Sequence, residues 1–276
     1  MKQPLISIRN LCVDYVTGDQ FFRAVKDVSL DIAESEILGL AGESGCGKST
    51  LAFSLLNLHQ PPAYITQGQI LFQNDDILKW PLNQLNRFRW SQVGMVFQSA
   101  MNSLNPVARI DKQFLDVLAR HTTMSKDEAI SRAEEMMALV DIPLSRLYDY
   151  PHQCSGGMRQ RIVIAICLAL SPRLIIMDEP TTALDVVVQR EILQQIHELK
   201  QKLDFSVLFI THDLALMLQF CDRIGIMKDG EIVELKDRAT LYEKPEHSYT
   251  RQLLEAIPGR HLFGRTWHEP LPEVSP

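Results

Sequence analysis

The sequence predicts an α/β fold, and three observations support that prediction. A glycine-rich loop at residues 42–49 stands between a buried apolar strand, ILGLA, and an apolar helix. From about residue 156 to 210, apolar strands alternate with helices, an order typical of strands that pair in parallel. A hairpin with an Asp229-Gly230 turn follows. The 276 residues suffice for one large domain, or for a domain that carries a smaller subdomain.

The composition excludes several classes of protein. Hydrophobic residues make up 46% and charged residues 22%, which argues against a disordered or fibrous chain. The formal net charge of −6 gives no basic field, so we expect no nucleic-acid partner. The longest apolar run, residues 162–170, is too short to span a bilayer, and the start of the chain lacks the apolar core of a secretory signal. We therefore expect a soluble protein that stays in the cytoplasm.

The five cysteines are scattered along the chain without a CxxC pair. Neither disulfides nor a structural zinc site is therefore expected. The cysteines are Cys12, Cys46, Cys154, Cys167 and Cys221.

Short apolar runs separated by turn residues predict strands at 5–15, 22–32, 36–41 and 68–72. One helix lies among them. It begins near Lys48 and ends before Pro61-Pro62, because proline cannot continue a helix. From about Gln92 to Tyr150 the pattern becomes helical, and residues 125–128 form a capping box. We therefore predict an inserted helical subdomain over about residues 92–155.

The alternation of helices and strands returns after residue 155. A helix ends before Pro172, strands follow at 174–177 and 206–210, and the helix between these strands reaches Leu203. Residues 223–228 and 231–235 form the closing hairpin. Beyond Lys236 we expect the order to thin, and the prolines from Pro258 onward predict an extended, partly mobile end.

Residues 42–49 match GxxxxGK[ST] in the strand–loop–helix context that this pattern requires. The glycines allow successive backbone N–H groups to turn toward a phosphate, and the helix N-terminus adds its dipole. Lys48 supplies a positive charge to the β- and γ-phosphate oxygens, and Ser49 is expected to ligate Mg²⁺. The predicted nucleotide-binding residues of this segment are Gly42, Glu43, Ser44, Gly45, Cys46, Gly47, Lys48, Ser49 and Thr50.

Two adjacent carboxylates, Asp178 and Glu179, follow the apolar strand at 174–177. In a parallel sheet they emerge at the carboxyl edge, where ligands bind. We expect Asp178 to hold Mg²⁺, directly or through water, and Glu179 to orient or deprotonate an attacking water. Alone, the pair is equally consistent with a solvated acidic turn. The phosphate-binding loop upstream favours the catalytic interpretation.

A second anion-binding helix N-terminus is predicted at residues 154–160, CSGGMRQ, where a serine and two glycines open an apolar helix. Alone, Ser-Gly-Gly is an ordinary helix cap. In this context the residues resemble the ATP-binding cassette of ABC transporters, over essentially residues 5–235. SGGMRQR is similar to the signature motif of that family, which assigns Ser155, Gly156, Gly157 and Met158 to the ATP of a partner cassette.

Other positions match further motifs of the family. Gln98 resembles the Q-loop glutamine, residues 182–185 resemble the D-loop with Asp185, His212 resembles the switch histidine, and Tyr15 resembles the aromatic that stacks on adenine. The resemblance implies a P-loop NTPase core of the ABC ATPase type, with an N-terminal antiparallel β subdomain. It also implies catalytic roles for Glu179, His212 and Gln98, and Mg²⁺ ligation by Ser49, Gln98 and Asp178.

The resemblance further implies a head-to-tail pair of cassettes that sandwich ATP and Mg²⁺. Residues 1–235 hold one cassette, so the chain needs a second, identical or different, ABC ATPase. Each phosphate-binding loop leaves one face of the γ-phosphate open, and the helix end at Ser155 offers donors for that face. In this family, hydrolysis opens the pair and is coupled to rearrangement of two integral membrane permease subunits.

A subfamily is indicated as well. Residues 101–106, MNSLNP, and the segment 245–258 are similar to the oligopeptide, dipeptide and nickel importers, which gives residues 236–276 the character of a C-terminal extension. This implies the ATPase subunit of a bacterial importer for peptides or similar small solutes. Such a subunit lies peripherally on the cytoplasmic face of the membrane and is served indirectly by an external solute-binding protein. Many relatives carry a cysteine cluster for an iron–sulfur centre; no cysteine follows Cys221, so we expect no such cluster.

Two other classes of function fit the sequence less well. A soluble ABC-type ATPase not coupled to transport would call for a long coiled coil, two cassettes in one chain, or basic surfaces. A P-loop kinase or metabolic ATPase would leave the Ser-Gly-Gly helix end without a role. In the ABC transporter family, the membrane subunits and a binding protein select the transported solute, so the sequence of the ATPase does not identify that solute.

Overall fold

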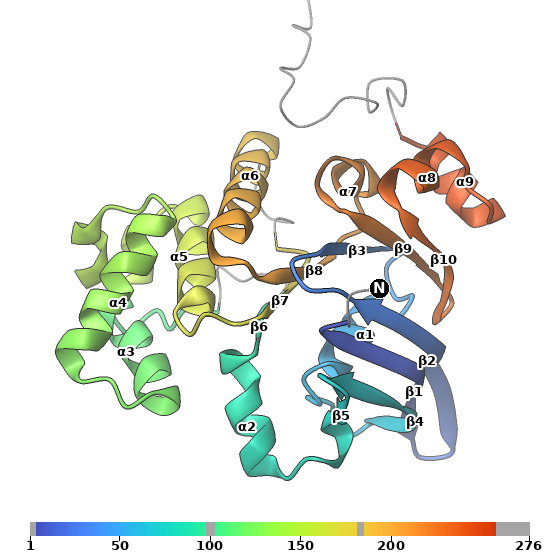
Figure 1. Cartoon of the computed structure of the whole chain (residues 1–276), viewed down its shortest axis with the longest axis horizontal. Coiled ribbons are helices and arrows are strands. Elements are labelled where there is room, and N and C mark those ends of the chain that lie inside the picture. Colours follow the sequence, from blue (N-terminus) through green and yellow to red (C-terminus); the bar gives the residue numbers. More distant parts are fainter. Residues whose placement is uncertain (1–3, 98–102, 181–184, 258–276) are drawn as a thin grey trace, which may run out of the picture.

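Two β-sheets organise the chain in its computed structural model, which describes residues 4–97, 103–180 and 185–257 (Figure 1). The smaller sheet is antiparallel, with the order β2 (Gln20–Ile32), β1 (Ile6–Thr17), β4 (Ala63–Phe72) and β5 (Asp75–Asp76). The larger sheet has the order β10 (Glu231–Asp237), β9 (Arg223–Lys228), β3 (Ile37–Ala41), β8 (Ser206–Ile210), β7 (Leu174–Asp178) and β6 (Val93–Val96). Its neighbouring strands pair in parallel, except that β10 runs antiparallel to β9. The predicted α/β fold with an antiparallel N-terminal sheet is confirmed.

The central parallel strands are buried on both faces, which explains their nearly continuous apolar sequences. Every residue of β7 and β8 is buried. Successive side chains of a strand point to opposite faces. Accordingly, Leu174 and Ile176 pack with the antiparallel sheet, whereas Ile175 and Met177 pack with the helices. Such a sheet presents only its carboxyl edge to a ligand.

Most of the helices lie on the face of the large sheet away from the antiparallel sheet, or beyond its edges (Figure 1). Beyond β6 lie α3 (Ile110–His121), α4 (Lys126–Leu139) and α5 (Gly156–Leu168), and α6 (Val186–Leu203) follows them toward the centre. On the side of β9 and β10 lie α7 (Leu214–Phe220), α8 (Arg238–Glu243) and α9 (Ser248–Glu255). α1 (Lys48–Ser54) packs between the two sheets, and α2 (Leu82–Ser91) precedes β6. Short 3-10 turns are η1 (Ile77–Lys79), η3 (Leu144–Tyr148) and η4 (Pro151–Gln153).

Several predictions of local structure are wrong. The helical pattern expected from Gln92 does not hold at 93–96, which form β6 beside β7. That apolar run is fully buried, and periodicity cannot distinguish a short buried strand from a helix. The helix expected to reach Pro61 ends at Ser54, and neither α2 nor α7 was predicted.

The expectation of thinning order beyond Lys236 is also wrong for the segment that forms α8 and α9. The side chain of Asp237 caps α8 by accepting a hydrogen bond from Thr240 N at 2.9 Å. His247 Nδ1 caps α9 by accepting from Tyr249 N at 3.2 Å. The end from Pro258 onward lies outside the described residues. Within the described ranges, no helix is both long enough and apolar enough to cross a membrane.

Candidate nucleotide-binding site

The loop between β3 and α1 takes a backbone path that requires glycine. Gly45 and Gly47 have φ angles of 83° and 105°, in the left-handed region that other residues rarely adopt. A Cβ at Gly47 would lie 2.4 Å from Ala24 O, so the loop also lies tightly against β2. This path turns the loop backbone inward at the N-terminus of α1, which is the arrangement that binds a phosphate.

Lys48, the first residue of α1, is folded back onto the loop. Its ammonium group donates to Gly42 O and Glu43 O, both at 2.8 Å, and lies 3.5 Å from Cys46 Sγ. The side chain is buried, so its charge is little screened by solvent. The loop therefore holds one positive charge at the position that the motif predicts for phosphate contact.

Asp178 ends β7 beside this loop and has the character of a metal ligand. It is 3% exposed, and within the described parts of the chain no hydrogen-bond donor reaches its Oδ1. Burial raises the pKa of Asp178; the hydrogen bond from Ser49 and the charge of Lys48 oppose that rise, and the negative charge of Glu179 adds to it. A buried carboxylate oxygen and a serine hydroxyl are the hard oxygen donors that Mg²⁺ prefers. Asp178 and Ser49 thus fit a magnesium ion.

Glu179 and His212 meet where β7 and β8 end. Glu179 has a left-handed φ of 45°, and its backbone N–H donates to Ile210 O at 2.9 Å. This turn directs the carboxylate toward the neighbouring strand end, where Oε1 lies 3.3 Å from His212 Nδ1. The Glu179 side chain is 14% exposed and the His212 side chain 62% exposed. The pair therefore stands at the solvent boundary of the site, where a water molecule can reach the carboxylate.

Tyr15, near the end of β1, lies beside the first turn of α1, which follows the phosphate-binding loop. Its hydroxyl is 3.4 Å from Thr50 Oγ1, on the first turn of α1. The residue predicted to stack on adenine is therefore adjacent to the loop predicted to bind the phosphates. The antiparallel sheet positions it, because Tyr15 pairs with Phe22 of β2 and Ala63 of β4.

The predicted signature residues open α5, apart from α1 (Figure 1). Ser155 Oγ accepts a hydrogen bond from Met158 N at 3.3 Å, so the serine is the N-cap of α5. Ser155 is exposed, and Gly156, Gly157 and Met158 are half-buried. Between residues 155–158 and 42–50, all of which the structure describes, no hydrogen bond forms. The signature thus presents its helix N-terminus to solvent and not to the loop of its own chain.

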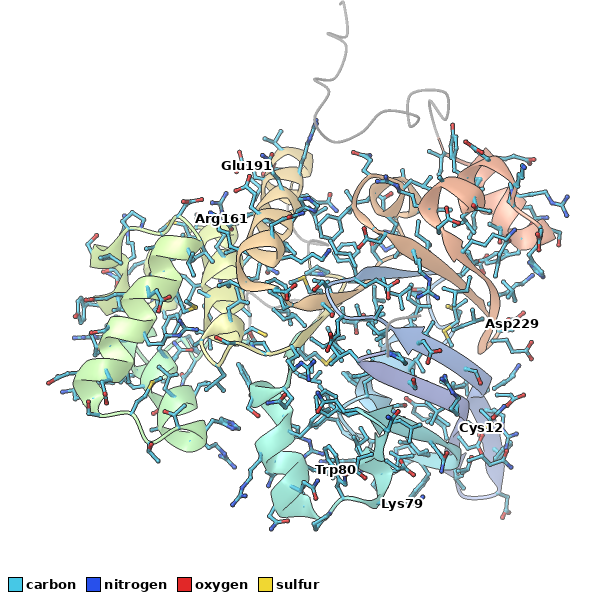
Figure 2. All side chains as sticks on the ribbon, viewed as in Figure 1. Cys12, Lys79, Trp80, Arg161, Glu191 and Asp229 are labelled. Carbon is cyan, nitrogen blue, oxygen red and sulfur yellow. The ribbon has the colours of Figure 1, made fainter. Side chains whose placement is uncertain are left out.

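α5 and α6 are held together beside this helix end. A Cβ at Gly157 would lie 3.0 Å from Val188 Cγ1, so glycine permits close approach of the two helices. Arg161 of α5 donates to Glu191 of α6 at 3.1 Å, and Figure 2 shows these two side chains facing one another. Asp185 is the N-cap of α6 and accepts from Val188 N at 3.0 Å. Gln98 and residues 182–184 of the predicted D-loop lie outside the described residues.

One residue at the site was missed by the sequence prediction. Tyr249 of α9 accepts a hydrogen bond at its hydroxyl oxygen from Glu43 N, at 3.2 Å. Its ring is buried, and Lys228 Nζ lies 4.8 Å from the ring centroid. The sequence carries no local signal for this contact, because it joins two segments far apart in the chain.

Taken together, these residues can bind a nucleoside triphosphate and cleave its terminal phosphate. The loop and Lys48 neutralise phosphate charge, Ser49 and Asp178 offer oxygen ligands to Mg²⁺, and Glu179 can take a proton from water. The structure brings together every predicted residue of this set that it describes.

Comparison with known proteins gives the same answer. A sequence model described as ABC transporter matches residues 25–182. The oligopeptide transport ATP-binding protein OppD of Bacillus subtilis (strain 168) is 38% identical over 275 residues, which are 99% of this chain and 77% of OppD. The dipeptide transport ATP-binding protein DppD of the same organism is 41% identical over 265 residues, which are 95% of this chain and 79% of DppD.

Solved structures share the architecture. A dimeric ATP-binding cassette in a post-hydrolysis state, bound to ADP and Pi, matches with a TM-score of 0.74 and 30% identity. The match covers 84% of this chain and 98% of the cassette's chain. The protein cbiO1 from Clostridium perfringens matches with a TM-score of 0.76 and 25% identity. The match covers 96% of this chain and 100% of the cbiO1 chain. The family match, the near full-length relatives and the geometry of the site agree: the chain belongs to the ABC transporter family and is an ATP-hydrolysing cassette.

Proposed function

We propose that this cassette powers a bacterial ABC importer for peptides or similar small solutes. The observation that supports this most is the similarity over 95–99% of the chain to ATP-binding proteins for oligopeptide and dipeptide transport. The similarity includes the segment beyond residue 235, which lies outside the residues assigned to nucleotide binding and hydrolysis. We assign residues 1–235 to the ATPase domain, with a helical subdomain inserted between β6 and about residue 155, and residues 236–276 to a C-terminal extension.

Nucleotide binding is assigned to the loop and to Tyr15. Backbone N–H groups of the loop and the Lys48 ammonium bind the phosphate oxygens, and Tyr15 stacks on the base. The assigned residues are Tyr15, Gly42, Glu43, Ser44, Gly45, Cys46, Gly47, Lys48, Ser49 and Thr50. Ser49 and Asp178 hold Mg²⁺, together with Gln98. When bound, this ion neutralises charge on the phosphate oxygens.

Glu179 is assigned as the general base. A water oxygen attacks the γ-phosphorus, the bond to the β-phosphate oxygen breaks, and the water proton passes to the Glu179 carboxylate. His212, 3.3 Å from Oε1, orients that carboxylate, and Gln98 completes the catalytic set. Asp178 and Glu179 are consecutive residues with different tasks. Asp178 is buried beside the loop and holds the metal ion, whereas Glu179 lies at the solvent boundary and accepts the water proton.

The second half of the site comes from a partner cassette. Ser155, Gly156, Gly157 and Met158 present a helix N-terminus to solvent, and an exposed helix N-terminus attracts an anion. In a head-to-tail pair, this end meets the γ-phosphate bound by the other subunit, and Asp185 lies at the same interface. ATP then joins the two subunits, and its hydrolysis allows them to separate. The second cassette is an identical or a different ABC ATPase.

The complete importer contains two integral membrane permease subunits and receives solute from an external binding protein. The cassette lies peripherally on the cytoplasmic face of the cell membrane and contacts no nucleic acid. The solute is selected by the other components, so it does not follow from the site.

Reconstitution tests this proposal. The cassette, co-expressed with the permease and partner-cassette genes of its operon, should co-purify with the membrane subunits. In vesicles supplied with the binding protein, it should drive peptide uptake that depends on ATP. Lys48→Ala should abolish uptake while the complex still assembles. A cassette that hydrolyses ATP but never associates with a permease would contradict the proposal and favour an ATPase not coupled to transport.

A further inference from the structure

The C-terminal helix α9 contacts the phosphate-binding loop through a single side chain. Tyr249 is 4% exposed, and its hydroxyl oxygen accepts the backbone N–H of Glu43 at 3.2 Å. Lys228, at the end of β9, places its ammonium 4.8 Å from the ring centroid, which is within range of a cation–π interaction. Burial of the ring and the nearby Lys228 ammonium thus hold the hydroxyl against the loop.

Glu43 connects this tyrosine to the loop lysine. Its N–H donates to Tyr249, and its carbonyl oxygen accepts from Lys48 Nζ at 2.8 Å. One residue of the loop backbone is therefore bonded on both sides, to α9 and to the side chain that neutralises phosphate charge. The Glu43 N–H shares its peptide group with Gly42 O, which also accepts from Lys48 Nζ at 2.8 Å, so loss of the tyrosine hydroxyl would release a peptide group that orients the Lys48 ammonium.

α9 itself is fixed to the large sheet by a buried carboxylate. Glu234 of β10 is 7% exposed and accepts from the backbone N–H groups of Glu246 at 2.8 Å and His247 at 3.0 Å. Lys236 Nζ lies 3.1 Å from the same carboxylate. Burial alone raises the pKa of Glu234, but the Glu246 and His247 amides, the Thr250 side chain and Lys236 hold it at about 2. The carboxylate therefore stays ionised near neutral pH, and the start of α9 stays docked on β10.

We propose that Tyr249 is a positioning residue of the phosphate-binding loop, through which docking of α9 sets the affinity of the cassette for Mg-ATP. This inference rests on the proposed ATP site and adds a role for the C-terminal extension within it. Because coupling between two equilibria is reciprocal, bound Mg-ATP should in turn stabilise the docked α9.

The first test is Tyr249→Phe in the full chain. The substitution retains the ring, its packing and the contact with Lys228, and removes the hydroxyl, which accepts from the Glu43 N–H and also bonds the Glu43 side chain. A net hydrogen bond of ordinary strength corresponds to about a two- to tenfold change in an equilibrium constant. We expect the Kd for Mg-ATP, measured by calorimetry, to rise by about that factor, with kcat at saturating ATP unchanged. Tyr148→Phe is the matched control, because that ring is 47% exposed and belongs to η3, away from the loop.

The outcomes separate a positioning role from a structural one. An unchanged Kd in Tyr249→Phe would overturn the proposal. A fall in kcat and in unfolding temperature alongside the rise in Kd would also overturn it, because the loss would then be one of general stability. Lys48→Ala tests the ATP site separately: if that variant still binds Mg-ATP as tightly as the parent, the site assignment fails whatever Tyr249→Phe does.

A double-mutant cycle tests the route from β10 to the loop. Glu234→Gln should weaken docking of α9 and raise the Kd, whereas Glu231→Gln on the exposed face of the same strand should not. If α9 acts through Tyr249, Glu234→Gln should raise the Kd less in the Tyr249→Phe background than in the parent. Fully additive changes would overturn the coupling. Slower amide exchange over residues 246–255 upon Mg-ATP binding, in the parent but not in Tyr249→Phe, is the expected reciprocal effect.

Discussion

At the scale of single residues, the chemistry of this site depends on how each group is exposed. Burial raises the pKa of the thiols of Cys154, Cys167 and Cys221, that of Cys167 to about 12. Burial therefore disfavours the thiolate form of all three. Cys46 differs in position, because its sulfur lies inside the phosphate-binding loop, 3.5 Å from the Lys48 ammonium.

Cys46 should therefore be the thiol whose modification inactivates the ATPase. An adduct on its sulfur would occupy the space of the phosphates, so an alkylating reagent should abolish hydrolysis and bound Mg-ATP should protect. The measurement compares inactivation rates of Cys46→Ser and Cys154→Ser with the parent. Cys46 is 8% exposed, so the reaction is expected to be slow but selective. Equal sensitivity of Cys46→Ser and the parent would remove Cys46 from this role.

Some site residues were predictable and others were not, for a physical reason. Lys48, Asp178 and Glu179 belong to contiguous motifs whose local strand–loop–helix geometry places them, so the sequence alone locates them. The contact of Tyr249 with Glu43 depends on where α9 packs, and packing is a tertiary property. The segment 245–258 was identified as a family marker, but nothing in its local pattern indicated that it reaches the phosphate-binding loop.

At the scale of secondary-structure elements, the same distinction holds. β3 and β7 were predicted because turn residues and motifs lie at the ends of their apolar runs. β6 was mistaken for the start of a helical region because a buried strand has no polar face to reveal its period. α9 is short and weakly marked in sequence. Its position depends on Glu234, which lies 12 and 13 residues before Glu246 and His247 and accepts their N–H groups.

The docking of α9 on β10 should make stability depend on pH. The folded protein holds the pKa of Glu234 at about 2, below the ordinary value of 4.5. The stabilisation by this carboxylate is therefore complete above about pH 4.5 and is lost as the pH falls toward 2. The shift corresponds to at most about 3 kcal/mol.

Denaturant unfolding at several pH values can measure this contribution. The difference in unfolding free energy between the parent and Glu234→Gln should be largest above pH 5 and should shrink as the pH falls toward 2. Glu231→Gln, on the same strand, controls for the charge change. A difference between parent and Glu234→Gln that stays constant over this range would mean that the ionised carboxylate does not anchor α9.

At the scale of the whole molecule, the proposed head-to-tail pair would complete the site. The start of α5 lies apart from α1 and the phosphate-binding loop, so in the proposed pair each subunit's residues 155–158 would serve the ATP of the other subunit (Figure 1). Gly156→Asp tests this arrangement. An acidic residue in the first turn of a helix is compatible with folding, but its carboxylate would face the partner's γ-phosphate and repel it. Single-subunit binding of Mg-ATP should persist while hydrolysis fails; loss of both together would indicate a folding defect instead.

Glu179→Gln should separate closure of the pair from hydrolysis. The amide keeps the size of the side chain but cannot accept the water proton, so turnover should fall by about 10²- to 10⁴-fold. Lys48, Ser49 and Asp178 are unchanged, so Mg-ATP still binds and holds the two subunits together. Size-exclusion chromatography with Mg-ATP should therefore show a stable pair for the variant and a transient one for the parent, with Glu243→Gln in α8 as a control. If the variant hydrolyses ATP at the parental rate, Glu179 is not the general base. If it loses turnover without forming a stable pair, hydrolysis is not the step that separates the two subunits.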